Sequence, residues 1–146
     1  MRMRVLALTL GAAAVLAGAA GATMSPVVSS RLAGKNETPK KGPAAASGIV
    51  VLHLDAKKGT ACWDFKGVKG FDKPAAAHIH KGLAGKAGPV VVAFGAAYKA
   101  KGCTKGAAKT IAAIEEHPNA YYVNVHSAKY PAGAIRGQLV AGMIGG

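Results

Sequence analysis

Residues 48–65 read GIVVLHLDAKKGTACWDF, and this stretch determines the class of the fold. Its first half is β-branched and then alternates, with Leu52 and Leu54 on one face and polar side chains on the other, which is the pattern of a half-buried strand. A Lys-Gly pair then turns the chain, and residues 60–65 alternate in the same way. The stretch therefore predicts a β-hairpin with one buried face.

Strand-like segments recur along the rest of the chain. The segment at 89–94 is almost continuously apolar, as in a strand buried within a sandwich. Only residues 105–117 show helical spacing, and Pro118 ends that pattern. With about seven short strands expected in all, we predict an all-β sandwich with one short helix. Four segments after the hairpin are rich in β-branched, aromatic or small apolar side chains and are separated by turns: residues 75–80, 89–94, 120–126 and 134–140.

The N-terminus predicts export. Arg2 and Arg4 precede an apolar run at 5–16, and small residues up to Ala22 offer a cleavage site to a signal peptidase. The alternative is an uncleaved membrane anchor, but the apolar run is short for a span and contains glycine. We therefore expect a secreted protein, extracellular or periplasmic, with no transmembrane segment after cleavage. The expected boundaries are a signal peptide at 1–22, a flexible N-terminal segment at 23–30 and a domain at 31–142.

The chain is strongly basic, with 19 lysines and arginines against six acidic residues and a formal net charge of +13. Removal of the signal peptide takes away Arg2 and Arg4 and leaves +11. Such a charge attracts polyanions and anionic lipid, although lysines spread along the chain are equally typical of a solvated surface. The candidate partners are anionic cell-envelope polymers or an extracellular protein, with no specific nucleic acid.

Cys62 and Cys103 are the two cysteines of the chain. In an oxidising compartment we expect them to form a disulfide. The alternative, a pair of metal-binding thiolates, lacks the close CxxC spacing of metal sites. A disulfide here closes a loop of about 40 residues, which is worth about 4 kcal/mol in the chain-entropy model.

Three histidines form the candidate site. His78 and His80 share one face of a predicted strand, and Asn124 and His126 share a face of another. If the strand ends meet, His78, His80 and His126 can hold copper or zinc, since neutral imidazole suits both metals. The alternative is that these histidines only bond to carbonyl or carboxylate groups and hold the sheet edges. No nucleophile motif, phosphate-binding loop or paired carboxylates point to an enzyme.

Arg136 lies between Ile135 and Gly137 on a strand that we expect to be half buried. A buried guanidinium needs a carboxylate or carbonyl partner. A structural ion pair is one interpretation, and steering of an anion or substrate toward the histidines is the other. We therefore count Asn124 and Arg136 as residues adjacent to the candidate site.

Four motifs, in order, give the chain a family resemblance: LAGKNETP at 32–39, AHIHKG at 77–82 with GPVVV at 88–92, YYVNVHS at 121–127 and PAGAIRGQL at 131–139. With them the chain resembles the CHRD domain, named after chordin and found in exported bacterial proteins. The resemblance covers about residues 31–140. It implies an immunoglobulin-like β-sandwich in which the histidine motifs lie near each other, and it implies no known reaction.

A fainter likeness connects the chain with copper–zinc superoxide dismutase, a Greek-key sandwich. His78, His80 and His126 would take the places of copper ligands, and Arg136 that of a substrate-steering arginine. The long loop of zinc ligands is missing here. We interpret the protein as a non-catalytic binding or structural module of the cell envelope or extracellular space. The alternative is a copper- or zinc-binding protein using His78, His80 and His126, with redox activity of the dismutase type.

Overall fold

The computed structural model describes residues 26–144, which form one antiparallel sheet of nine strands in the order β5-β4-β7-β8-β1-β2-β3-β6, with β9 paired to β1. The expected all-β fold with one short helix is confirmed. The expected signal peptide at 1–22 lies outside the described residues. The elements are β1 (Val27–Ala33), η1 (Gly34–Asn36), β2 (Ser47–Asp55), β3 (Thr60–Lys69), β4 (Pro74–Lys81), β5 (Val90–Ala93), β6 (Lys101–Lys105), α1 (Ala108–Glu116), η2 (Pro118–Ala120), β7 (Tyr121–Ser127), β8 (Ile135–Gln138) and β9 (Val140–Ala141).

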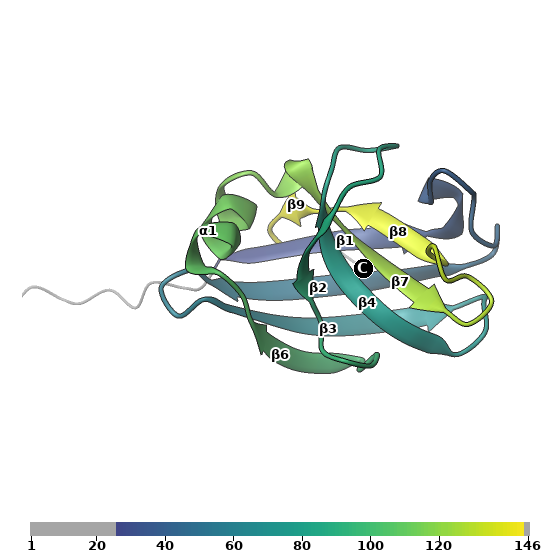
Figure 1. Cartoon of the computed structure of the whole chain (residues 1–146), viewed down its shortest axis with the longest axis horizontal. Helices are drawn as coiled ribbons and strands as arrows, with labels where there is room; N and C mark the ends of the chain where they lie inside the picture. The colour runs from purple at the N-terminus through teal and green to yellow at the C-terminus, as the bar shows by residue number, and fades with distance from the viewer. Residues whose placement is uncertain (1–25, 145–146) are drawn as a thin grey trace, which may run out of the picture.

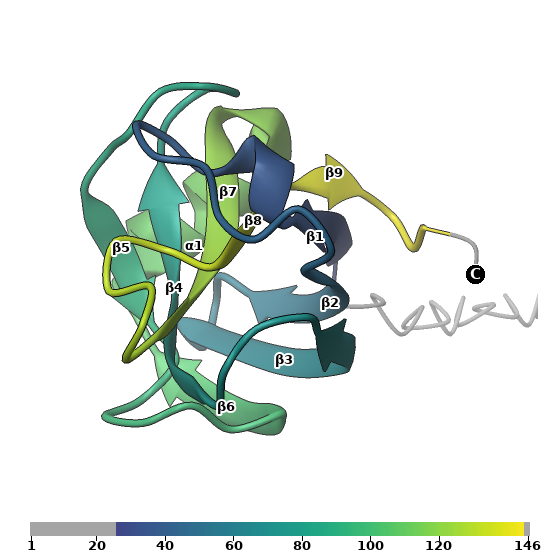
Figure 2. The ribbon, with the colours of Figure 1, turned by 90° about the vertical axis from the view of Figure 1, so that its right-hand side faces the viewer.

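The sheet folds over on itself, so that β4 and β7 cross in front of β1, β2 and β3 (Figure 1). In the view turned by 90°, β4, β5 and β7 lie on one side and β1, β2 and β3 on the other (Figure 2). Side chains from both layers fill the space between them, because one face of each strand is apolar. The core includes Leu52, Leu54, Trp63, Phe65, Ile79, Val123, Val125 and Ile135.

The hairpin predicted from residues 48–65 is the β2–β3 pair. Leu52 lies opposite Trp63 and Leu54 opposite Ala61, and all four side chains are buried. Trp63 stacks on Phe94 with ring centroids 4.7 Å apart, so the aromatic side chains of the hairpin reach across the core. The alternation of apolar and polar residues therefore correctly predicted which face of this hairpin is buried.

Strand β6 has no counterpart among the expected strands, because its sequence KGCTK has no apolar face. It forms where it pairs with β3, with Cys103 directly opposite Cys62. The two cysteines form the expected disulfide. The disulfide and the hydrogen bonds to β3 therefore hold this strand in place, and a hydrophobic face does not contribute.

Helix α1 begins at Ala108, three residues after the expected start at 105, and ends at Glu116. Ile111 and Ile114 are fully buried, and the helix lies across one end of the folded sheet (Figure 1). Its Glu115 carboxylate accepts a 2.9 Å hydrogen bond from the backbone N–H of Ala56. This bond ties the helix to the turn between β2 and β3.

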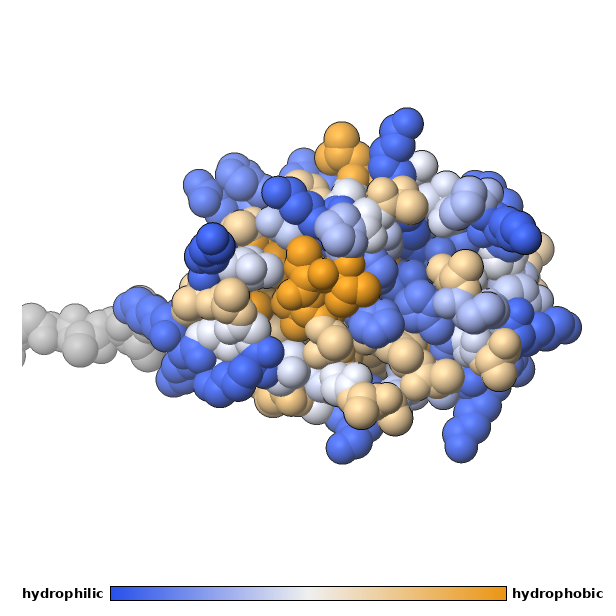
Figure 3. All heavy atoms as spheres, viewed as in Figure 1, coloured by the Kyte–Doolittle hydropathy of each residue, from blue (hydrophilic) through white to orange (hydrophobic). Residues whose placement is uncertain are grey.

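Two details of the expected layout are wrong. The strand at 89–94, expected to be buried, is the edge strand β5, where Val90 is 49% exposed and only the alternate side chains of Val92 and Phe94 are buried. Figure 3 shows an apolar patch over this edge on an otherwise largely hydrophilic face. The segment expected to be flexible at 23–30 contributes the start of β1 at Val27, because Val28 packs into the core opposite β2.

No helix within residues 26–144 has the length and apolar character needed to cross a membrane.

Candidate metal centre

The three histidines predicted to converge lie together on the outer face of β4 and β7. In the register of these strands, His78 lies opposite Asn124, His80 opposite Tyr122 and Ala76 opposite His126. The alternate residues, such as Ile79 and Val125, point into the core. Period-two alternation on two neighbouring strands therefore gathers the imidazoles on one surface.

The three rings are close enough to share one ion. One ring nitrogen from each of His78, His80 and His126 lies within 4.8 Å of the others. His78 Nδ1 and His126 Nε2 are 3.1 Å apart. Among the described residues this is the group of histidine, cysteine or acidic side chains with a geometry suited to a metal ion. We refer to it below as the histidine cluster.

Backbone carbonyls fix the protonation of two of these rings. His80 Nδ1 lies 2.9 Å from the carbonyl oxygen of Gly88, and His126 Nδ1 lies 2.9 Å from that of Pro131. A carbonyl oxygen only accepts, so both Nδ1 atoms carry the hydrogen, and the lone pair of each neutral ring is at Nε2. Such bonds are the usual means by which proteins orient metal-binding histidines.

The Nε2 lone pair of His80 is buried and has no hydrogen-bond partner. The residue is only 9% exposed. An unpaired buried acceptor costs about 1–3 kcal/mol, so such atoms are rare in folded proteins. The amide oxygen of the neighbouring Asn124 is likewise buried without a partner. These atoms are unsatisfied within the protein itself, and a cation at the cluster would satisfy the nitrogen.

Burial keeps the histidine cluster neutral. Loss of solvation lowers the pKa of all three rings, and at His78 the charges of the other two lower it further. At His80 the hydrogen bond to Gly88 and the interaction with the Asn124 side chain oppose the effect of burial without reversing it. Neutral imidazole is the form that binds metals, so burial here favours the ligand form at neutral pH.

Arg136 is next to the cluster, but it is enclosed by the protein. Its Nη2 atom donates to the carbonyl oxygens of Leu83 at 3.0 Å and Lys86 at 2.7 Å, so the carbonyl partners expected from the sequence are present. The guanidinium lies over the Tyr122 ring, with Cζ 3.3 Å from its centroid, and the residue is 2% exposed. This enclosure favours the structural interpretation of Arg136 over substrate steering.

Glu37 is a second buried charged group near this surface. It is 2% exposed, and its Oε1 atom has no hydrogen-bond partner. Burial raises the pKa of its carboxyl group to about 7, although the charge of Arg136 opposes the shift. The carboxyl group also lies against Gly133, in the loop that supplies the Pro131 carbonyl to His126.

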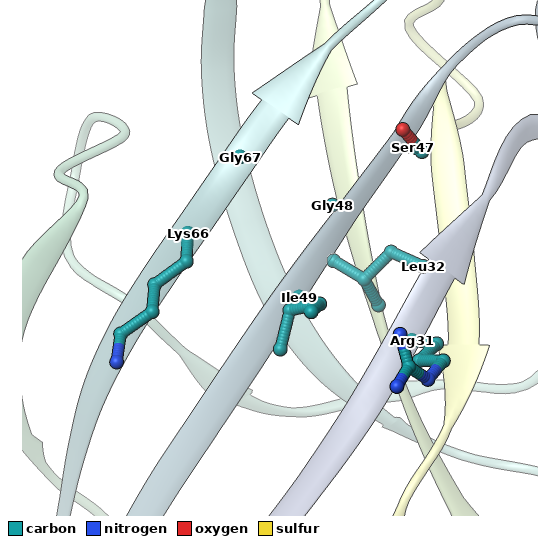
Figure 4. Close-up of a pocket in the computed structure, with 7 residues that line it drawn as sticks. All are labelled: Arg31, Leu32, Ser47, Gly48, Ile49, Lys66 and Gly67. Atoms are coloured by element: carbon teal, nitrogen blue, oxygen red, sulfur yellow. The ribbon is translucent and has the colours of Figure 1, made fainter. Parts of the chain in front are cut away.

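Two hollows in the surface lie outside the histidine cluster. The larger measures about 380 Å³ and lies on strands β1, β2 and β3, where its lining includes Arg31, Ile49 and Lys66 (Figure 4). None of its lining residues belongs to the histidine cluster. The smaller, of about 280 Å³, lies beside Arg136 and Gln138. The chemistry-bearing residues therefore occupy a surface site on β4 and β7, outside both hollows.

A family model described as the CHRD domain matches residues 28–139. The chain belongs to the CHRD domain family. The match contains the whole histidine cluster, Arg136 and both cysteines, and it begins within β1, in agreement with the strand start at Val27. Comparisons with curated proteins and with solved structures gave no match.

Three contributors to the site were not predicted from the sequence. The carbonyls of Gly88 and Pro131 orient two histidines, and backbone groups in loops carry no sequence signal of their own. Tyr122 stacks on His80, with centroids 4.8 Å apart and planes 8° from parallel. It stands two residues before Asn124, so the same alternation that selected Asn124 and His126 also places Tyr122 on the site face.

Proposed function

We propose that this CHRD domain binds one copper or zinc ion through Nδ1 of His78, Nε2 of His80 and Nε2 of His126. The observation that carries the proposal is the buried, unpartnered Nε2 of His80, which faces a cluster where all three ring nitrogens lie within 4.8 Å. The carbonyls of Gly88 and Pro131 place the lone pairs of His80 and His126 at Nε2. The lone pair of His126 accepts a 3.1 Å hydrogen bond from Nδ1 of His78, and a bound metal ion would take the place of that hydrogen.

The spacing of the nitrogens fits a small transition-metal ion. Metal–nitrogen bonds of about 2.0–2.1 Å place two nitrogens 3.1 Å apart at about 100° around the ion, close to the tetrahedral angle. Two ligands of one ion lie at most about 4.2 Å apart. Tetrahedral coordination places two such nitrogens about 3.4 Å apart, so a pair at the 4.8 Å limit closes by about 1.4 Å when metal binds.

The ligand set indicates the kind of metal and its use. Three imidazoles without a thiolate suit copper and zinc, and three protein ligands leave a coordination position for water or another molecule. If the ion is copper, it supplies one-electron chemistry, which is the basis of the dismutase-like alternative. A superoxide dismutation assay on copper-loaded protein tests that alternative separately from binding.

We also propose that the protein is exported. The basic and apolar residues at 1–16 and the small residues that follow support a signal peptide. The Cys62–Cys103 disulfide is compatible with an oxidising compartment. An exported domain that binds a metal ion is one form of the binding module of the envelope or extracellular space that the sequence indicated. The N-terminal sequence of the secreted protein tests this: it begins at Thr23 if the signal is cleaved as expected.

Calorimetric titration of the purified protein with Zn(II) and Cu(II) tests the metal site. We expect one ion per chain for the wild type and no tight binding for the His78→Ala/His80→Ala variant. His53→Ala is the matched control, because His53 is an exposed histidine on another strand, and it should bind as the wild type does. A wild type that binds neither ion below millimolar concentration contradicts the proposal.

A further inference from the structure

A three-layer stack lies behind one of the proposed ligands. The ring of Tyr122 is stacked on His80, with planes 8° from parallel. The guanidinium of Arg136 covers Tyr122 at 3.3 Å from the ring centroid. The order His80–Tyr122–Arg136 therefore places a fixed positive charge behind a metal ligand, with one aromatic ring between them.

Hydrogen bonds hold this stack in place. Arg136 is fixed by the carbonyls of Leu83 and Lys86, so its guanidinium cannot move away without breaking both bonds. The hydroxyl of Tyr122 accepts a 3.1 Å bond from the N–H of Gly88, whose carbonyl orients His80. The stack and the ligand are thus anchored to one loop.

The histidine cluster brings no negative charge to a bound metal ion. The cluster consists of three histidines with no carboxylate among them, so the neutral ligands do not offset the charge of the ion. The carboxyl group coupled to Arg136 is that of Glu37. Burial raises its pKa to about 7, so Glu37 offsets the guanidinium charge only above that pH. The positive charge of the guanidinium repels a bound ion, and the three neutral ligands do not offset this repulsion. The repulsion grows with the charge of the ion.

We propose that the Arg136–Tyr122 stack makes this site selective for monovalent copper, Cu(I), over divalent ions. The inference rests on the proposed metal site. A divalent ion has one more charge than Cu(I) to place in the field of Arg136. At a separation on the order of 10 Å and an effective dielectric constant of about 20, that extra charge changes the affinity by roughly tenfold.

Affinities for Cu(I) and Zn(II) measured on the same protein test the inference. Cu(I) is titrated anaerobically against bicinchoninate, and Zn(II) against a chromophoric chelator, both at pH 6.5, where the Glu37 carboxyl group is mostly protonated. We expect Arg136→Gln to lower the ratio of Cu(I) to Zn(II) affinity about tenfold. Arg136→Lys keeps the charge and should keep most of the ratio. A purely structural role of Arg136 would weaken both metals equally in both variants and leave the ratio unchanged.

Glu37→Gln supplies a test in the opposite direction. It removes a carboxylate coupled to Arg136 while keeping the shape of a buried side chain, so the ratio should rise severalfold at pH 8. This variant decides the question if Arg136→Gln does not fold. An unchanged ratio in the folded variants overturns the inference while leaving the metal site intact, whereas a wild type that binds neither ion overturns the proposed function itself.

Discussion

The buried carboxyl group of Glu37 allows a quantitative prediction about stability. The side chain is 2% exposed, and burial raises its pKa from 4.5 to about 7. Glu37→Gln preserves the shape of the side chain but removes its ionisation. We expect this substitution to stabilise the protein at pH 8 and to have little effect at pH 4.

The sign and size follow from proton linkage. The folded state holds the Glu37 proton more tightly than the unfolded state, so the stability from this group is complete below pH 4.5 and is lost as the pH rises through about 7. A shift from 4.5 to about 7 corresponds to a loss of about 3 kcal/mol, since each pKa unit is worth about 1.4 kcal/mol. The glutamine side chain that Glu37→Gln introduces does not titrate, so the variant avoids this loss.

Urea unfolding of the metal-free protein at pH 4, 6 and 8 measures the effect. The buried Trp63, stacked on Phe94, reports unfolding by its fluorescence. The difference in unfolding free energy between Glu37→Gln and the wild type should grow with pH. Glu116→Gln is the control: Glu116 is exposed and lies 3.7 Å from the exposed His117, so we expect a much smaller change with pH. A difference that stays constant or shrinks between pH 4 and 8 refutes the reasoning.

Three further predictions concern the disulfide, a glycine and the pH dependence of metal binding. Replacing Cys62 and Cys103 together by serine should lower the unfolding free energy by about 4 kcal/mol in urea titrations, because their bond closes a 41-residue separation; an unchanged midpoint would contradict this. Gly133→Ala should destabilise the protein by about 2 kcal/mol more than Gly85→Ala, since both glycines have positive φ but only at Gly133 would a Cβ lie 2.5 Å from the Glu37 carboxyl group; equal thermal shifts would argue against that contact. Because burial lowers the pKa of the three cluster histidines below 6.5, zinc affinity should stay constant as the pH falls to 6.5 and decline only below it; a decline centred above pH 6.5 is inconsistent with neutral, buried ligands.

The sequence predicted those parts of the fold that depend on side-chain alternation. Strands β2 and β3 were located from the inward Leu52, Leu54 and Trp63, and the histidine cluster from the same rule applied to β4 and β7. Strand β6 was missed because KGCTK has no hydrophobic pattern and forms only by pairing with β3. The edge position of β5 was also missed, because a run of valines is compatible with both an edge strand and a buried strand of a sandwich.

The three side chains of the histidine cluster were predictable from the sequence, but the groups that surround them were not. The prediction named His78, His80 and His126 because residues two apart on a strand point to the same face. The carbonyls of Gly88 and Pro131 come from loops whose paths depend on tertiary packing. The placement of Arg136 over Tyr122 likewise depends on how β8 lies beside β7, and nothing in the local sequence specifies that geometry.

The most direct test of the central claim is to identify the ring nitrogens that bind zinc. Long-range ¹H–¹⁵N NMR of the histidine rings distinguishes protonated, free and metal-bound nitrogens. On addition of one equivalent of Zn(II), we predict metal-bound signals at Nδ1 of His78 and at Nε2 of His80 and His126, with the Nδ1 hydrogens of the last two retained. Unchanged signals from these three rings, or shifts confined to His53 and His117, would contradict the proposed metal site.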